Sequence, residues 1–294
     1  MEPKVYIDGE LYPKSQAKIS VFDHGLLYGD GIFEGIRVYS GRIFRFREHI
    51  DRLFESAGAL RLEMPVGREE MDRVVEDTVR ANGFRDAYIR LVVTRGTGDL
   101  GIDPRKCNKS SLIVIVDKIQ LYNQQLYEQG IPLVTASTRR IRPDMLNQRA
   151  KSLNYLNSIM AKMEAADAGV AEALMLDADG NVAECTADNI FVVKNGGLLT
   201  PATHFPILNG VTRRVVLELA AKLGIPAVEG TLTLHDIYTA DECFLTGTGA
   251  ELIPVISLDS RTIGDGKPGP VTARLLKKFR GLHATEGTDL FALE

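Results

Sequence analysis

Two amphipathic helices that follow a strand hairpin limit what the first half of this chain can form. Phe33 to Tyr39 and Arg42 to Phe46 have the composition of strands joined at Ser40-Gly41. Arg47 to Leu60 and Arg68 to Ala81 then repeat apolar residues at the spacing of one helix face. The first half of the chain is therefore predicted to combine strands with helices that are apolar on one face.

Polar residues between two apolar halves predict the domain organisation. A chain of 294 residues has room for about two domains. Lys118 to Gly130 is polar and follows the nearly all-apolar Leu112 to Val116, which we expect to be a strand buried on both faces. We therefore predict a small N-terminal α/β domain over residues 1–120, a linker over 121–131 and a larger C-terminal domain over 132–294.

The second half also mixes strands and helices. Alternation and turn residues predict strands at Pro132 to Ser137 and Glu242 to Thr246, with hairpins turning at Ala178-Asp179-Gly180 and Asn195-Gly196-Gly197. Apolar periodicity predicts helices from Lys151 to near Gly169, at Thr212 to Leu223 and at Val271 to Phe279.

The bulk composition excludes several classes of function. The net charge of −4 and the scattered basic residues give no reason to expect nucleic acid or an anionic membrane as partner. The N-terminus does not resemble a signal peptide, and no apolar stretch has the length of a membrane span. Cys107, Cys185 and Cys243 lack CxxC spacing, and the histidines lack the spacing of metal ligands. We expect a cytoplasmic protein without a metal site.

Lys151 is the candidate nucleophile. It lies in the stretch from Gln148 to Asn157, ahead of a predicted helix that would present Tyr155, Ile159 and Met163 on one apolar face. An amine held partly out of water loses its proton more readily and can form a Schiff base with a carbonyl. A surface lysine in front of a helix fits the same residues, and the local pattern alone favours that alternative.

Small residues mark two candidate anion sites. Gly210-Val211-Thr212-Arg213 opens a predicted helix, whose first N–H groups suit a phosphate, although Thr212 as a simple N-cap is the safer local interpretation. Thr246-Gly247-Thr248-Gly249 could bind phosphate or carboxylate, or be an ordinary turn. Gly96 to Gly101 has the G-x-G-x-x-G shape, but no suitable helix follows, which excludes a Rossmann site. Glu184 ends a predicted strand and could face solvent or pair with a protonated ring nitrogen.

Seven segments together carry a resemblance that none carries alone. They are Tyr28 to Arg37, Phe44 to Leu53, Tyr88-Ile89-Arg90, Ala150 to Tyr155, Glu184 to Phe191, Gly210 to Arg213 and Thr246 to Glu251. Their order and spacing resemble the class IV pyridoxal-phosphate aminotransferases, and most closely the branched-chain amino acid aminotransferases. The resemblance runs from about Val5 to Phe279. It implies a two-domain α+β fold like that of D-amino acid aminotransferase, with the active site between the domains.

The resemblance implies pyridoxal 5′-phosphate as cofactor, bound mainly by the larger C-terminal domain. Lys151 matches the lysine that holds the cofactor as a Schiff base and carries the proton between the substrate Cα and cofactor C4′. Glu184 matches the acid on the pyridine nitrogen, and Tyr155 the tyrosine on the phenolic oxygen. The groups that match phosphate ligands are Arg52, Val211, Thr212 and Thr248.

The resemblance also implies the substrates. The expected reaction is transamination of L-leucine, L-isoleucine and L-valine with 2-oxoglutarate. Tyr88 and the Thr248-Gly249 backbone match groups that hold the α-carboxylate, and Arg90 matches the arginine for the distal carboxylate of glutamate. The residues that match the pocket wall are Tyr28, Phe33 and Arg37.

Self-association is a further implication of the resemblance. Leu100 and Ile102 match a loop that reaches the neighbouring subunit's active site. The expected partners are therefore small amino and 2-oxo acids and further copies of the chain, in a homodimer or a hexamer formed as a trimer of dimers. The resemblance ranks neither these two states nor leucine, isoleucine and valine.

Two residues depart from the plainest branched-chain pattern. Arg95 lies where D-amino acid aminotransferases place a carboxylate-binding arginine, but those enzymes lack the Tyr88-x-Arg90 pair. Thr138 is smaller than its usual counterpart, which leaves aromatic substrates or unusual amine acceptors possible. The alternatives are thus a D-amino acid aminotransferase, an aminodeoxychorismate lyase of the same fold, or a binding protein that kept the scaffold.

Overall fold

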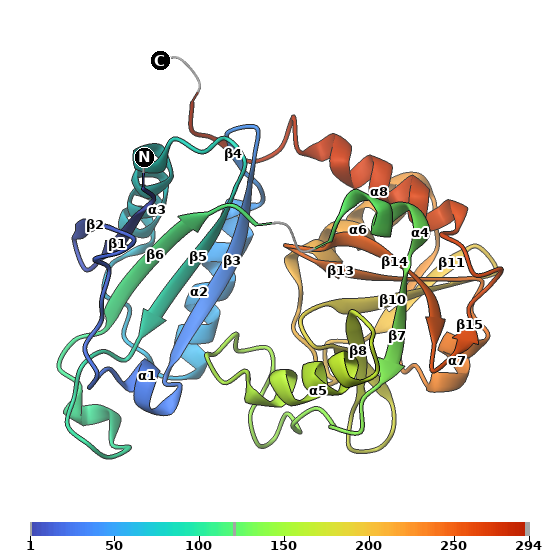
Figure 1. Ribbon diagram of the computed structural model, residues 1–294, viewed down its shortest axis with the longest axis horizontal. Helices are drawn as coiled ribbons and strands as arrows, with labels where there is room; N and C mark the ends of the chain where they lie inside the picture. The colour runs from blue at the N-terminus through green and yellow to red at the C-terminus, as the bar shows by residue number, and fades with distance from the viewer. Residues whose placement is uncertain (1, 120–121, 292–294) are drawn as a thin grey trace. The chain divides into compact units, whose positions relative to one another are not determined.

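The computed structural model describes residues 2–119 and 122–291, which form two compact units (Figure 1). Unit 1 contains the described residues up to 119 together with 150–154 and 283–291, and unit 2 contains 122–149 and 155–282. Two short segments from the second half of the chain therefore belong to the first unit. The division into domains at 1–120, 121–131 and 132–294 remains a prediction.

Unit 1 is an antiparallel sheet with helices on one face (Figure 1). Among the described residues the strand order is β16-β4-β3-β5-β6-β1-β2. The strands are β1 (Lys4–Ile7), β2 (Glu10–Pro13), β3 (Gly31–Tyr39), β4 (Arg42–Ile43), β5 (Ala87–Thr94), β6 (Ser111–Asp117) and β16 (Thr288–Asp289). The helices are α1 (His24–Tyr28), α2 (Phe46–Ala59), α3 (Arg68–Asn82) and the 3-10 turn η1 (Pro104–Lys106). The predicted helices at 47–60 and 68–81 are confirmed as α2 and α3.

Alternation along β3 and β5 gives the unit 1 sheet two different faces. Ile32 and Ile36 of β3 are fully buried with Ile89 of β5, in a core that includes Ile50 and Leu53 of α2. Successive strand residues point to opposite faces, so the intervening positions of both strands lie on the other face. Expected burial of β6 on both faces is wrong. Its even-numbered apolar residues are buried, but Ile115 is 36% exposed because the helices cover only one face.

Unit 2 is built on a mixed sheet. The strand order is β12-β11-β10-β13-β14-β7-β8-β9, and β15 pairs with β14. The pairs β11–β12, β7–β14 and β7–β8 are parallel and the others antiparallel. The strands are β7 (Ile131–Thr135), β8 (Glu172–Leu176), β9 (Val182–Cys185), β10 (Asn189–Lys194), β11 (Gly197–Pro201), β12 (Ala227–Gly230), β13 (Glu242–Gly247), β14 (Glu251–Leu258) and β15 (Arg261–Thr262). The helices are α4 (Gln124–Gln129), α5 (Leu156–Asp167), α6 (Val211–Leu223), α7 (Leu234–Tyr238) and α8 (Pro270–Leu282).

The helix expected to begin at Lys151 begins instead at Leu156. The apolar face predicted for this helix is exposed and not buried. Ile159 and Met163 are 51% and 56% exposed, whereas Ala161 and Ala165 are fully buried in a cluster with Ala173 of β8. Small residues let a helix approach a sheet closely, so alanines form the packed face of α5 and the bulky residues point outward. The polar segment predicted as a linker contains the short helix α4, whose N-cap Asn123 accepts from the Leu126 N–H at 3.0 Å.

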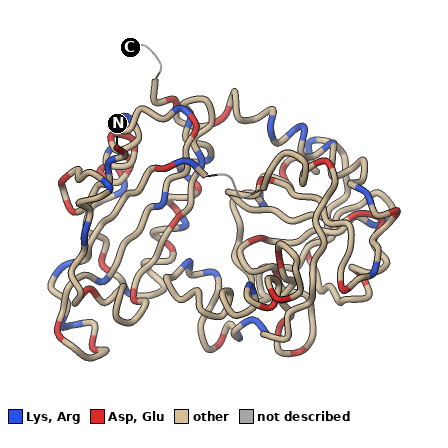
Figure 2. The backbone as a smooth tube through the Cα atoms, viewed as in Figure 1, with Lys and Arg blue, Asp and Glu red and all other residues tan. Residues whose placement is uncertain are grey.

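Charge is distributed evenly in both units. Basic and acidic residues are interspersed along the chain in Figure 2. Among the described residues, no helix combines the length and apolarity that crossing a membrane requires.

Candidate active site

The main chain of Lys151 is held against β3 and α2 within unit 1. Ser152 forms an antiparallel bridge with Ile32, and the N–H of Phe33 donates to the carbonyl of Lys151 at 3.0 Å. On its other side, the N–H of Lys151 donates to Oγ of Ser56 at 3.0 Å. This pairing makes the lysine segment an extended addition to β3, which explains why no helix begins there. Nζ of Lys151 lies 4.5 Å from the centroid of the Phe33 ring.

A buried ionic cluster fixes Arg52 on α2. Oε1 of Glu34 accepts from Nε of Arg52 at 2.7 Å. Oε2 of Glu34 accepts from Nη2 of Arg52 at 2.7 Å and from Nδ1 of His49 at 2.8 Å. Burial raises the pKa of Glu34, but Arg52 and His49 outweigh it and leave that pKa far below its ordinary value. Burial lowers the pKa of His49 despite the opposing effect of Glu34. The two hydrogen bonds between Arg52 and Glu34 hold the Arg52 guanidinium in the plane of the carboxylate.

The face of the unit 1 sheet that the helices leave open carries an apolar ring with cations beside it. Gly35 of β3 lies opposite Arg90 of β5, and Arg37 lies opposite Tyr88. The Tyr88 hydroxyl lies over Gly35, where a β-carbon would be 1.9 Å from its oxygen, so only glycine fits. Cζ of Arg90 lies 4.3 Å from the Phe33 ring centroid. Phe33, Arg37, Tyr88 and Arg90 thus lie on one face of the sheet.

Tyr28 lies at the end of α1 and holds a loop. Its hydroxyl accepts from the N–H of Gly101 at 2.8 Å, and Nε2 of His24 lies 2.9 Å from the carbonyl oxygen of Asp99. Leu100 and Ile102 extend from this tethered loop with 68% and 84% of their surface exposed.

Arg95 is engaged inside unit 1. Its Nε and Nη2 donate to the two carboxylate oxygens of Asp30 at 2.9 and 3.0 Å. The guanidinium also donates to the carbonyls of Leu60 and Arg61. These contacts give Arg95 a structural role in anchoring the end of α2.

Glu184 on β9 is held by donors from three parts of unit 2. Arg140 approaches Oε1 at 3.0 Å, whereas Asn189 Nδ2 and the N–H of Leu208 both donate to Oε2 at 3.0 Å. The carboxylate is buried, so the alternative in which it faces solvent is wrong. Arg140 and Asn189 were not predicted as site residues. Arg140 lies in a basic run with Arg139 and Arg142, and only its burial distinguishes it.

The start of α6 has no side-chain cap. Its N-cap is Gly210, which has no side chain to accept from the first N–H groups, so the interpretation of Thr212 as N-cap is wrong. A β-carbon on Gly210 would lie 2.1 Å from Oδ1 of Asn189. Glycine is therefore required where Asn189 packs against the helix start. Val211 and Thr212 form the buried first turn.

The end of β13 contains an unpaired buried hydroxyl. Oγ1 of Thr246 has no hydrogen-bond partner among residues 2–119 and 122–291. Thr246 lies opposite Asn189 in the pairing of β13 with β10. A β-carbon on Gly247, the last residue of β13, would lie 1.9 Å from Oδ1 of Asp188, so this position also favours glycine. An orphaned hydroxyl here suits a polar ligand, and Thr246 lies in the stretch through Gly249 that the sequence marks as a candidate anion site.

The predicted residues thus divide between the units. Unit 1 contains Tyr28, Phe33, Arg37, Arg52, Tyr88, Arg90, Leu100, Ile102 and Lys151, and unit 2 contains Tyr155, Glu184, Val211, Thr212, Thr248 and Gly249. Tyr155 is the N-cap residue of α5. Among the described residues, no group of three His, Cys, Asp or Glu side chains could hold a metal ion.

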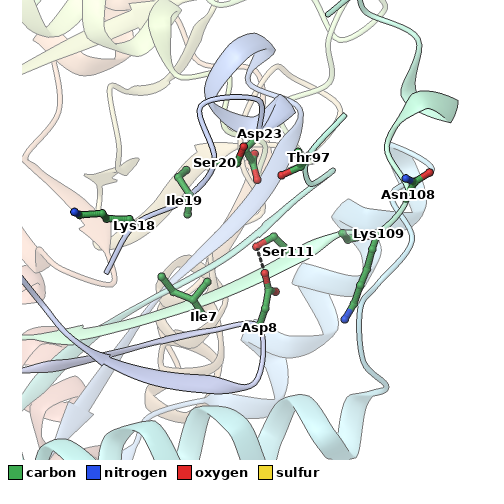
Figure 3. Close-up of a pocket in the computed structure, with 11 residues that line it drawn as sticks. Ile7, Asp8, Lys18, Ile19, Ser20, Asp23, Thr97, Asn108, Lys109 and Ser111 are labelled. Carbon is green, nitrogen blue, oxygen red and sulfur yellow. Dashed lines mark hydrogen bonds between the residues drawn. The ribbon is translucent and has the colours of Figure 1, made fainter. Parts of the chain in front are cut away.

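A separate cavity of about 440 Å³ lies in unit 1 and is lined by none of these predicted residues (Figure 3). The two carboxylates that line it already have hydrogen-bond donors. Asp8 accepts from Oγ of Ser111 and from the N–H of Leu112, each at 2.7 Å, and Asp23 accepts from the Gly25 N–H and the Thr94 hydroxyl.

Comparison with known proteins places this arrangement in a family. Residues 31–258 match the model of the amino-transferase class IV family. The chain therefore belongs to the class IV aminotransferases, and its two-unit α+β architecture is the fold expected from the sequence. A protein of Methanocaldococcus jannaschii, named provisionally as a branched-chain-amino-acid aminotransferase, is 52% identical over 288 residues, which cover 98% of this chain and 99% of that protein.

Solved structures of branched-chain amino acid aminotransferases are also similar to this chain. The branched-chain amino acid aminotransferase of Escherichia coli superposes with a TM-score of 0.94 at 34% identity, covering 99% of this chain and 98% of that one. The branched-chain aminotransferase of Thermoproteus uzoniensis, solved with norvaline, gives a TM-score of 0.90 at 38% identity, covering 96% and 95%.

Proposed function

We propose that the protein uses pyridoxal 5′-phosphate to transfer the amino group of L-leucine, L-isoleucine or L-valine to 2-oxoglutarate. The observation that carries the proposal is the position of Lys151. Its main chain is fixed by Phe33 and Ser56, and its amine lies over a ring on the same open sheet face that carries Tyr88 and Arg90. The named relatives and solved neighbours support this substrate class.

The residues present fit the cofactor. The unpaired Oγ1 of Thr246 and the glycine N-cap of α6 offer polar atoms for a phosphate, alongside Val211, Thr212 and Thr248. Arg52, with its plane fixed by Glu34, would supply a cation for the same group. When bound, pyridoxal 5′-phosphate supplies an electron sink for the charge that develops when the substrate loses its Cα proton.

Each proposed catalytic residue has a distinct task. Lys151 would bind the cofactor carbonyl covalently and, once released, hold the proton that moves from the substrate Cα. Glu184 would keep a proton on the ring nitrogen, and Tyr155 would donate to the phenolic oxygen.

The substrate side chain would meet an apolar wall with one cation at its edge. Phe33 offers the apolar surface for a branched side chain, and Arg90 beside it can pair with the distal carboxylate of glutamate. Tyr88 and the Thr248-Gly249 backbone would hold the α-carboxylate common to both substrates. Tyr28 and Arg37 complete the proposed wall.

We also propose that the chain self-associates at least as a dimer. The outward face of α5 carries Leu156, Ile159, Met160 and Met163, each between 48% and 69% exposed. A continuous apolar helix face of this kind marks an association surface. Light scattering should give at least twice the chain mass and distinguish a dimer from a trimer of dimers. An Ile159→Glu/Met163→Glu variant should be monomeric, and an unchanged mass would reject this surface.

Amino-donor specificity tests the proposed reaction. The protein purified with pyridoxal 5′-phosphate should be yellow, and Lys151→Ala should lose that absorbance band. L-leucine with 2-oxoglutarate should yield glutamate, whereas D-alanine should react at least a hundredfold more slowly. A preference for D-alanine would establish the D-amino acid alternative, and release of pyruvate from aminodeoxychorismate would establish the lyase. The cytoplasmic location remains a prediction.

A further inference from the structure

Arg140 is a buried cation whose contacts converge on one carboxylate. Its side chain is 5% exposed, and one guanidinium nitrogen donates to Oγ of Ser158 at 2.7 Å. The other donates to the carbonyl of Cys185 at 2.8 Å and lies 3.0 Å from Oε1 of Glu184. A guanidinium is costly to remove from water, so such a position indicates a specific need for its charge.

The neighbouring loop provides an internal contrast. Arg142 is two residues away, 52% exposed, and pairs with Asp144, which is also exposed. Surface pairs of this kind contribute little. The burial of Arg140 is therefore a property of its position next to Glu184 and not of the basic run in which both arginines occur.

The two carboxylate oxygens of Glu184 have different kinds of donor. Oε1 faces Arg140, while Oε2 accepts from Asn189 and Leu208. Asn189 also donates to the carbonyl of Leu208, in the loop that leads into α6. The carboxylate plane is thus fixed from both sides, by a cation on one oxygen and by neutral donors on the other.

A cation beside Glu184 would affect how this buried carboxyl group shares a proton with the ring nitrogen of a bound cofactor. Low-dielectric surroundings favour a neutral acid beside a neutral ring over a carboxylate beside a protonated ring. A fixed cation at the carboxyl group reverses that preference because it stabilises the carboxylate. The proton then resides on the ring.

We infer that Arg140 is a positioning residue that keeps Glu184 ionised and oriented, so that the ring nitrogen of the cofactor stays protonated. This inference rests on the proposed function. It assigns Arg140 no contact with the substrate or the ring, because its effect passes through Glu184.

The test reads the proton directly. Wild-type protein, Arg140→Gln, Arg140→Lys, Glu184→Gln and the control Arg142→Gln are loaded with pyridoxal 5′-phosphate carrying ¹⁵N in the ring, and the ¹⁵N chemical shift is followed against pH. Wild type and Arg142→Gln should show a protonated ring at neutral pH. Arg140→Gln should move toward the unprotonated shift, and Arg140→Lys should recover part of the difference.

Kinetics and cofactor binding supply the second readout. Removing a residue that orients a catalytic group typically costs about 10–100-fold in activity. We expect Arg140→Gln to lose that factor in kcat with KM changed by less than about threefold, because the substrate groups remain in place. Fluorescence titration should give a cofactor Kd within about threefold of wild type, since Lys151 and the phosphate ligands remain. If Arg140→Gln does not fold, Ser158→Ala loosens the same guanidinium and should shift the ring titration in the same direction.

The outcomes separate the inference from the function on which it rests. A protonated ring in Arg140→Gln and Ser158→Ala, together with loss of ring protonation in Glu184→Gln, would overturn the role of Arg140 and leave the proposed function intact. A wild-type protein that does not bind the labelled cofactor would overturn the proposed function itself. A Glu184→Gln variant with an unchanged ring would overturn the proposed role of Glu184 and the inference about Arg140.

Discussion

The backbone N–H of Lys151 donates to the side-chain oxygen of Ser56, 95 residues earlier in the chain, at 3.0 Å. The same hydroxyl donates to the carbonyl of Arg52 at 2.8 Å. Ser56 is 1% exposed, so no water replaces either bond easily. One buried hydroxyl thus connects the candidate nucleophile with the helix turn that presents the candidate phosphate arginine.

Replacing Ser56 by alanine should destabilise unit 1. The change leaves the Lys151 N–H buried and unpaired, which costs about 1–3 kcal/mol in unfolding free energy. Urea unfolding of the cofactor-free protein measures this loss, and the exposed Ser15→Ala serves as control. A Ser56→Ala variant as stable as Ser15→Ala would mean that the bond contributes nothing.

Arg90→Ala should discriminate between the two acceptors. Loss of a charged pair with the distal carboxylate should raise KM for 2-oxoglutarate about 10–100-fold. KM for 4-methyl-2-oxopentanoate should rise much less, because that acid has no distal carboxylate. Arg85→Ala, on a guanidinium that stacks over Phe291, provides the control for loss of an arginine in unit 1. Equal losses for both acceptors would reject a shared pocket with one optional ion pair.

Two glycine substitutions should have opposite effects. Gly35→Ala places a β-carbon 1.9 Å from the Tyr88 hydroxyl and should cost about 1–3 kcal/mol while raising KM for both substrates. Gly58→Ala on α2 meets no atom within 4 Å and should stabilise by about 0.5–1 kcal/mol. Thermal unfolding of both variants measures the difference, and a neutral Gly35→Ala would show that Tyr88 is free to move.

Glu164 should make stability depend on pH below about 4.5. Its carboxylate accepts from the N–H and hydroxyl groups of both Ser137 and Thr138. Partial burial raises its pKa, but these bonds outweigh that effect and lower the pKa to about 2 from the ordinary 4.5. A lowered folded-state pKa stabilises above 4.5, and that stabilisation is lost as pH falls toward 2.

Because Glu164 is partly solvated, the expected contribution is only about 1 kcal/mol at neutral pH. Glu164→Gln should be less stable than wild type by that amount at pH 7 and equal to it near pH 2. Urea unfolding at several pH values gives the difference. A gap that persists unchanged at pH 2 would attribute the effect to packing and not to charge.

Local pattern was sufficient for some elements and not for others. The helices α2 and α3 were predictable within about two residues because their apolar spacing and the Asn82-Gly83 end lie in the sequence itself. Lys151 was identified only through the order of seven motifs. Its immediate surroundings predict a helix, because the strand with which it pairs lies more than a hundred residues earlier.

Burial was the main information that the sequence did not contain. The packed face of α5 is made of Ala161 and Ala165, so a search for bulky residues selected the opposite, exposed face. Arg140 and Arg142 are indistinguishable as residue types, and only the fold buries one and exposes the other. Asn189 and Thr246 are brought together only by the pairing of β10 with β13, which the sequence does not show.

The residence of 150–154 in unit 1 has a consequence for biosynthesis. A ribosome must deliver the chain through Asn154 before the N–H of Phe33 can pair with the carbonyl of Lys151, so the N-terminal unit stays unfinished while residues 122–149 of the second unit are being made. A fragment truncated at residue 119 would leave the part of β3 that pairs with Lys151 and Ser152 as an exposed strand edge, which can pair with a strand of another molecule. Premature termination should therefore yield insoluble material, and supplying the missing pentapeptide in trans should relieve it.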